Sequence, residues 1–175
     1  LVGSGGARPA YRAVHATLRS MRSADLVARA DALARSYLDQ GVTFDFAGEE
    51  RPFPLDVVPR VIAADEWVGI ESGVAQRVRV LEAFLADVYG RREAVRAGVV
   101  PWRVVASASG FQRVAAGVEP ANGVRVHVAG VDLVRDADGT IRVLEDNVRV
   151  PSGVSYVLAN RQAMATVFPD FPNFT

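Results

Sequence analysis

The sequence predicts an α+β fold in which an antiparallel sheet packs with helices, and three observations support this prediction. Residues 65–89 carry apolar side chains at helical spacing. Residues 42–55 and 124–147 are instead rich in the β-branched and aromatic residues of strands, and each stretch contains a Gly-bearing turn signal, so two hairpins are predicted. With 175 residues, the chain is long enough to bury the core of one domain.

The composition excludes several classes of function. Half of the residues are hydrophobic and the formal net charge is zero, which indicates neither a disordered chain nor a basic nucleic-acid-binding protein. Lys and Cys are absent, so this chain offers no Schiff-base lysine, no phosphate-binding lysine, no disulfide and no thiolate. No apolar run approaches the roughly 20 residues that span a bilayer. We expect a cytoplasmic protein with no nucleic-acid or membrane partner.

The N-terminal region predicts a leader followed by helix. The opening, LVGSGGARPAY, lacks the basic and apolar regions of a signal peptide, and its Gly cluster has neither a preceding strand nor a following Lys. A flexible leader is therefore expected rather than a phosphate loop. Residues 8–40 predict one or two helices, with Ser23 capping the second and Gly41 ending it. The chain starts with Leu and stops in FPDFPNFT, so both ends are expected to be cut from something longer.

The middle of the chain predicts a hairpin and a long helix. Residues 42–55 favour a hairpin with a Gly-Glu-Glu turn, and residues 54–62 favour an extended segment because two prolines bias their neighbours away from helix. A helix over residues 65–89, followed by Gly90, is expected to bury one apolar stripe in the core. That stripe consists of Trp67, Ile70, Val74, Val78, Leu81, Leu85 and Val88.

The last third predicts strands followed by a helix. A short helix at residues 91–98 and a connector through Trp102 are expected first. Residues 124–134 and 141–147 then predict two strands, and residues 153–168 predict a closing helix.

The two strands carry the chemistry of the sequence. Between them lies RDADGT, in which Asp138-Gly139 favours a two-residue type I′ turn. That turn would place Asp132 opposite Glu145, Gly130 opposite Asn147, and Val134 opposite Val143. Because side chains alternate along a strand, Asp132, Glu145 and Asn147 would share one face, with the space beside the amide left open by glycine.

Two carboxylates that face each other need a positive charge between them. Mg²⁺ prefers oxygen ligands, including one or two carboxylates, so Asp132, Glu145 and Asn147 are the candidate metal ligands. The alternative is a solvated hairpin whose carboxylates are paired with arginines. A three-residue turn in place of the type I′ turn would break the Asp132–Glu145 pairing.

The residues after Asn147 suit an anion. Arg149 continues the same face if the strand persists, and Ser152 is a candidate N-cap for a helix starting near Gly153. A helix start offers unpaired N–H groups and a partial positive charge. Carboxylates for a cation, followed directly by an arginine and a helix start for an anion, are typical of a metal–nucleotide site.

The motif VDLVRDADGTIRVLEDNVR resembles the metal-binding hairpin of the ATP-grasp ligases, in which an acidic residue and a Glu-x-Asn hold the magnesium ions of ATP. A closer resemblance, to the beginning of the circularly permuted ATP-grasp family, covers about residues 41–171. It rests on GVTFDF, RPFPLDVVPRVI, QRVRVLEAFLADVYG and HVAGVDLVRDADGTIRVLEDNVRVPSGVSYVLANR. Bacterial members of that family are often labelled uncharacterised or glutathionylspermidine-synthase-like.

The resemblance implies a site and a role. Asp132, Glu145 and Asn147 would hold Mg²⁺, Arg149 would act as a catalytic and ATP-binding residue, and Ser152 and Gly153 would help to bind ATP. The chain would be the N-terminal part of an ATP-dependent carboxylate–amine ligase, with residues 1–40 a helical segment and residues 41–175 an ATP-grasp-like α+β domain. Its partners would be the remaining C-terminal portion, a carboxylate and an amine.

Two other functions are open to the sequence. A non-catalytic module could use the apolar tail, FPDFPNFT, to dock on a partner protein. A two-carboxylate hydrolase could use Asp132 and Glu145, but it would leave Asn147 and Arg149 without a role. His127, expected within the first strand, is expected to have a structural or surface role, and Arg60 and Arg77 are expected to be solvated. Arg161, on the closing helix, could turn toward the hairpin.

Overall fold

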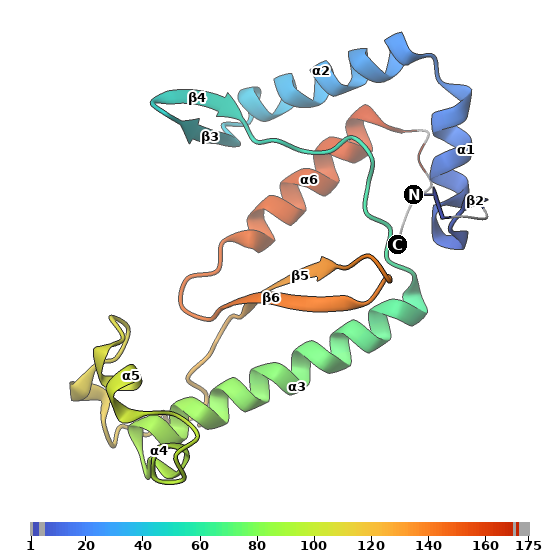
Figure 1. Cartoon of the computed structure of the whole chain (residues 1–175). Coiled ribbons are helices and arrows are strands. Elements are labelled where there is room, and N and C mark those ends of the chain that lie inside the picture. The colour runs from blue at the N-terminus through green and yellow to red at the C-terminus, as the bar shows by residue number, and fades with distance from the viewer. Residues whose placement is uncertain (1, 4–5, 170, 172–175) are drawn as a thin grey trace. The chain divides into compact units, whose positions relative to one another are not determined.

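The computed structural model describes residues 2–3, 6–169 and 171 (Figure 1). It is an α+β fold, as the sequence predicts, with helices and small two-stranded antiparallel sheets. The chain divides into two compact units, one made of residues 1–66 with 152–175 and the other of residues 67–151. The sequence predicted a helical segment at residues 1–40 and a domain at residues 41–175, and that domain division stays a prediction.

The first unit begins with a short pairing and two helices. Strands β1 (Val2–Gly3) and β2 (Gly6–Ala7) pair antiparallel, and η1 (Pro9–Tyr11) leads into α1 (Arg12–Ser20) and α2 (Ser23–Asp39). Residues 1, 4 and 5 of the expected leader lie outside the described residues. Ser23 is the first residue of α2 rather than its cap, and Arg22 takes the cap position.

Gly41 ends α2 as predicted. Its φ of 66° is the left-handed conformation that glycine adopts without strain. The N–H groups of Gly41 and Val42 donate to the carbonyls of Leu38 and Tyr37, which satisfies two of the free carbonyls at the helix end.

The first hairpin turns one residue earlier than the sequence suggests. Strands β3 (Thr43–Phe46) and β4 (Glu49–Pro52) are joined by Ala47 and Gly48, which both have positive φ, at 56° and 85°. This is the geometry of a two-residue type I′ turn, whose twist matches that of the strands. The two glutamates expected in the turn therefore lie in β4.

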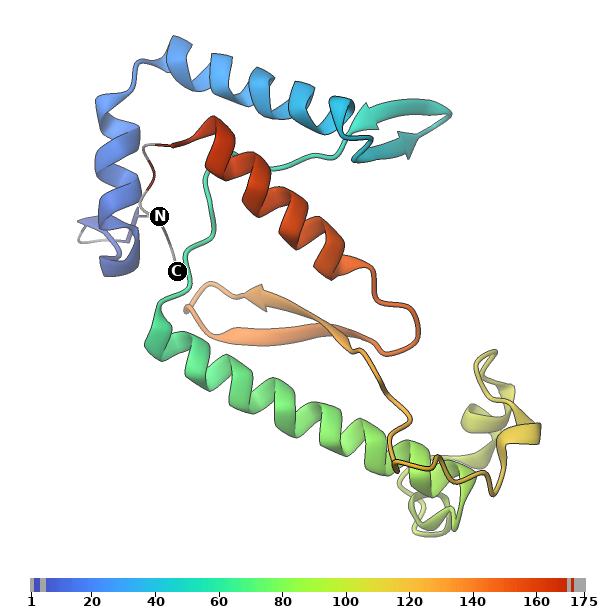
Figure 2. The ribbon, with the colours of Figure 1, turned by 180° about the vertical axis from the view of Figure 1, so that it is seen from behind.

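The core of the first unit joins segments that are far apart in the sequence. Leu33 and Tyr37 of α2 pack with Ala163 of α6 (Gly153–Val167), and the two helices lie side by side in Figures 1 and 2. The Tyr37 hydroxyl donates to the amide oxygen of Asn160 at 2.5 Å. Phe168 is also buried and stacks on Phe171, so this part of the apolar tail is packed in the unit; residues 170 and 172–175 lie outside the described part.

The second unit is built on one long helix. Helix α3 (Ala64–Tyr89) matches the predicted span, and Gly90 follows it. Its apolar stripe is buried less completely than expected: Ile70 and Val88 are buried, whereas Trp67 is 52% exposed. Short helices α4 (Glu93–Arg96), α5 (Trp102–Ser107) and η2 (Arg113–Ala115) follow, so part of the expected connector is helical. Within the described residues, no helix is both long and apolar enough to cross a membrane.

Strands β5 (Gly130–Arg135) and β6 (Ile141–Asn147) form the second hairpin, which lies along α3 in both views (Figures 1 and 2). Strand β5 starts six residues later than predicted, because Arg125 and Val126 donate their backbone N–H groups to the Glu82 carboxylate of α3 instead of to a strand. His127 therefore precedes the strand rather than lying in it.

Candidate functional site

The turn of the β5–β6 hairpin has three residues rather than the predicted two. The Asp136 N–H donates to the Thr140 carbonyl at 3.0 Å, and the Gly139 N–H donates back to the Asp136 carbonyl at 3.1 Å. Ala137, Asp138 and Gly139 thus form the loop, and Gly139 has a φ of 93°. This is a common three-residue hairpin connection, with the glycine in the position that needs positive φ.

A β-bulge compensates for the longer turn. Near the turn, Val134 pairs with Arg142 and Leu133 with Val143, so the predicted Val134–Val143 pairing is wrong. The register then shifts between Leu133 and Asp132, where Leu144 is the extra residue on β6.

Beyond the bulge, the predicted cross-strand pairs are present. Asp132 pairs with Glu145, and Gly130 pairs with Asn147. The pairing expected to fail with a three-residue turn therefore survives, because one extra residue in the loop is offset by one extra residue in the strand.

The hairpin has two chemically different faces, and the bulge decides which β6 side chains lie on each. The half-buried face, on which all but one of the side chains are partly buried, consists of Val131, Leu133, Arg135, Ile141, Val143 and Asp146. The open face consists of Gly130, Asp132, Val134, Arg142, Glu145 and Asn147, and all of these except the glycine are exposed. The three predicted metal ligands share the open face.

The open face presents acidic oxygen ligands without a basic neighbour between them. Within the part of the chain that the structure describes, neither Asp132 nor Glu145 forms an ion pair, and Arg142 is paired with Asp136 at the turn. Arg149 is exposed beyond the end of β6, which stops at Asn147. Among the described residues, the structure therefore does not show the alternative in which arginines form ion pairs with Asp132 and Glu145.

Asp146, between the two predicted ligands on β6, has a role that the sequence did not reveal. Both of its carboxylate oxygens accept hydrogen bonds from the Arg77 guanidinium of α3, each at 2.6 Å. This bidentate bond lowers the pKa of Asp146 and raises that of Arg77. Arg77, expected to be solvated, therefore ties the hairpin to α3. The bulge lets Asp146 face Arg77. The sequence feature that indicates this bulge is the adjacent apolar pair Val143-Leu144, which breaks the strict alternation of apolar and polar residues.

Pro151 takes the space beside Gly130 that was expected to be open. A Cβ atom built on Gly130 would lie 2.8 Å from the Cβ of Pro151 and 3.9 Å from that of Asn147. The absence of a side chain therefore lets the chain after β6 approach the start of β5. Pro151 therefore packs beside Gly130 at the end of the hairpin that carries Asn147.

Ser152 and Gly153 stand at the predicted place, the start of α6. The Ser152 hydroxyl makes no capping hydrogen bond, and its backbone carbonyl accepts the N–H of Ser155 instead. Both residues belong to the first unit, whereas the hairpin belongs to the second. Their part in a nucleotide site stays a prediction.

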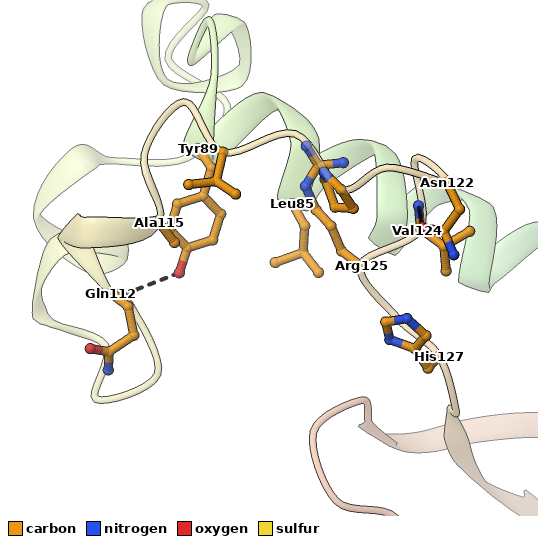
Figure 3. A pocket seen from close by; sticks show the side chains of 10 residues that line it. Leu85, Tyr89, Gln112, Ala115, Asn122, Val124, Arg125 and His127 are labelled. Carbon is orange, nitrogen blue, oxygen red and sulfur yellow. Dashed lines mark hydrogen bonds between the residues drawn. The ribbon is translucent and has the colours of Figure 1, made fainter.

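A separate hollow of about 440 Å³ lies at the far end of α3 (Figure 3). Leu85, Tyr89 and His127 are among its lining residues, and the Tyr89 hydroxyl accepts the N–H of Gln112. Arg125 also lines it and forms ion pairs with Glu82 and Glu119. Burial alone would raise the pKa of Glu82, but hydrogen bonds from the backbone N–H groups of Val126 and Arg125, together with the Arg125 guanidinium, outweigh it and the pKa is lowered.

Comparison with known proteins decides the family. The profile described as "Circularly permuted ATP-grasp type 2" matches residues 59–174, which include α3 and both strands of the β5–β6 hairpin. This chain belongs to the circularly permuted ATP-grasp family. The resemblance seen in the sequence is thereby confirmed.

Relatives of this ATP-grasp chain are longer than it is. An uncharacterized protein of Mycobacterium tuberculosis is 56% identical over 163 residues, which cover 93% of this chain and 30% of that protein. An uncharacterized protein of Synechocystis is 52% identical over 134 residues, covering 74% and 28% of the two chains. A Frankia casuarinae protein named "Putative glutamate--cysteine ligase 2-2" is 46% identical over 168 residues, covering 95% and 19%. The chain thus spans about a third or less of these relatives.

The donor set of the ATP-grasp hairpin fits Mg²⁺. Two carboxylates and one amide oxygen on an exposed face would leave coordination positions for water and phosphate, which is how Mg²⁺ is usually bound in proteins. No group of three or more His, Cys, Asp and Glu side chains able to hold a metal occurs among the described residues. The part that these residues would take in a site completed by a nucleotide stays a prediction.

Proposed function

We propose that this chain supplies the Mg-ATP ligands of an ATP-dependent carboxylate–amine ligase and forms the N-terminal part of it. The observation that carries the proposal is the pairing of Asp132 with Glu145, with Asn147 on the same exposed face. Membership of the ATP-grasp family supports it, and so does the name of the Frankia relative, which is that of a ligase. Cytoplasmic location is part of the same proposal.

The roles of the residues follow from their chemistry. When bound, Mg²⁺ would neutralise charge on the phosphate oxygens of ATP. Asp132 and Glu145 would hold the cation through carboxylate oxygens and Asn147 through its amide oxygen. The exposed guanidinium of Arg149 would stabilise the charge that develops on the transferred phosphoryl group.

The proposed reaction forms an amide bond in two steps. A substrate carboxylate takes the γ-phosphoryl group of ATP, which leaves ADP and an acyl phosphate. The nitrogen of an amine then attacks the acyl carbon, and phosphate leaves as the amide forms. This chain lacks Lys, so lysines that bind the nucleotide would come from the remaining C-terminal portion of the ligase.

The test uses the longer protein that contains this chain. Glu145→Gln and Asn147→Ala are each expected to weaken binding of Mg-ATP roughly tenfold or more, since even the outer partners of metal ligands cost that much when removed. Calorimetry with Mg-ATP and the rate of ATP turnover measure the effect. Glu71→Gln, an exposed carboxylate on α3, is the matched control and is expected to change neither quantity.

Unchanged Mg-ATP affinity and turnover in both hairpin variants would remove the assignment. Calorimetry on this chain and on the longer protein also separates the ligase from a non-catalytic module, because a module that only binds a partner protein would bind Mg-ATP in neither form.

A further inference from the structure

The β5–β6 hairpin has two possible registers, which place different side chains beside Asp132. With its three-residue turn and no bulge, the pairing near the turn would continue along the strands, so Leu144 would face Asp132 and Glu145 would face Val131. The bulge at Leu144 moves Glu145 into the position opposite Asp132.

The two registers also differ in which face each β6 side chain joins. Without the bulge, strict alternation would put Glu145 and Asn147 on the half-buried face with Ile141 and Val143, and Asp146 on the open face. With the bulge, Asp146 joins Ile141 and Val143, and the other two side chains face outward. The bulge therefore exchanges the positions of the candidate metal ligands and Asp146.

A two-stranded hairpin does not by itself fix such a choice. Isolated hairpins are marginally stable in water, and register is weakly specified where little surface is buried. An interaction that exists in only one register can therefore decide between them.

The Arg77–Asp146 ion pair is such an interaction. Its two 2.6 Å hydrogen bonds leave the Asp146 side chain only 17% exposed, and they require Asp146 to face α3. We propose that this ion pair selects the bulged register and thereby places Glu145 opposite Asp132, with Asn147 on the same face. Arg77 is then a positioning residue for the metal site, and that role rests on the function proposed above.

Nuclear magnetic resonance of the chain tests this directly. Cross-strand contacts between backbone protons of Asp132 and Glu145 report the bulged register, and contacts between Asp132 and Leu144 report the alternative. In Arg77→Ala, the ratio of bulged to unbulged hairpin is expected to fall roughly tenfold, as for the loss of a bidentate hydrogen bond between charged groups. Arg79→Ala, which removes an exposed arginine from the same helix, is expected to keep the parent pattern.

A charge-reversed pair keeps the test decisive if Arg77→Ala does not fold. Arg77→Asp combined with Asp146→Arg is expected to restore the Asp132–Glu145 contacts that Arg77→Asp alone loses. Parent-like contacts in Arg77→Ala, or a double variant no better than Arg77→Asp alone, would overturn the proposal.

Failure of the positioning role and failure of the ligase function give different results. Glu145→Gln removes a candidate metal ligand but leaves the ion pair, so its hairpin is expected to keep the bulged register. If Glu145→Gln leaves Mg-ATP binding of the longer protein unchanged, the function fails, while the backbone contacts of the Arg77 variants still decide the register.

Discussion

Leu144 and Gly130 show how single residues set the chemistry of the hairpin. Leu144 is the extra residue of the bulge, and its side chain is 73% exposed. It therefore affects the hairpin by shifting the backbone register of β6, and not by burying an apolar side chain. Gly130 contributes by having no side chain, because Pro151 lies where a Cβ atom would be. Neither effect follows from the polarity of the residue itself.

Gly130→Ala is expected to destabilise the chain by about 1–3 kcal/mol, the usual cost of adding an atom to a filled space. The added Cβ would lie 2.8 Å from that of Pro151, and both atoms are close to the backbone. Urea unfolding followed by circular dichroism measures the change. The matched control is Gly69→Ala in α3, where no atom apart from the neighbouring residues and the backbone of the same helix turn lies within 4 Å of the new Cβ. Equal stability of the two variants would contradict the argument.

The elements of the second unit depend on carboxylates that bind backbone N–H groups. Asp87, near the end of α3, accepts the N–H groups of Glu93 and Ala94 at 2.7 and 3.0 Å and so caps the start of α4. Glu82 does the same for the segment before β5. These two side chains hold the chain on either side of α5 against the long helix.

Asp87 predicts a pH dependence of stability. Backbone N–H bonds from Ala94 and Glu93 lower its pKa in the folded chain, so its contribution is fully present above the unfolded value of about 3.9 and is lost as the pH falls through the lower, folded value. Asp87→Asn is therefore expected to lower the urea midpoint at pH 7, and the difference from the parent should shrink below about pH 4. Asp39→Asn, at an exposed position in α2, is the control. A constant difference at both pH values would refute the capping role.

At the scale of the whole molecule, the first unit is made from both ends of the described chain. Tyr37 and Asn160 are 123 positions apart, yet they share a hydrogen bond beside the Leu33–Ala163 contact. The core of this unit therefore needs α6 as well as α2. The second unit is continuous in sequence, and it contains the β5–β6 hairpin together with Arg77, which forms an ion pair with Asp146 of that hairpin.

Tyr37→Phe tests how much the Tyr37–Asn160 hydrogen bond between α2 and α6 stabilises the first unit. The substitution keeps the buried ring but removes the hydroxyl, and is expected to cost about 1 kcal/mol, the usual net value of a hydrogen bond. Asn160→Ala leaves the Tyr37 hydroxyl without its partner and is expected to cost about 1–3 kcal/mol. The double variant should cost less than the sum of the two single variants, as judged by urea unfolding. Strict additivity would show that the two side chains are not coupled.

Much of the local structure was predictable from the sequence. The periodic apolar residues of α3, the left-handed Gly41 after α2 and the start of α6 at Gly153 are encoded within a few residues of where they occur. The errors fall where local signals compete. Asp138-Gly139 is compatible with two-residue and three-residue turns. The strand predicted before Gly130 does not form there, because the backbone N–H groups of Arg125 and Val126 donate to Glu82 instead.

The sequence by itself determined the α+β class, the hairpin with Asp132, Glu145 and Asn147, and the family to which these motifs belong. Only the tertiary structure decided that a bulge turns those side chains outward while Asp146 meets Arg77. The physical reason is the distance along the sequence over which each interaction acts. Helix period and turn chemistry act between near neighbours, whereas the face that a strand presents depends on partners 69 positions away.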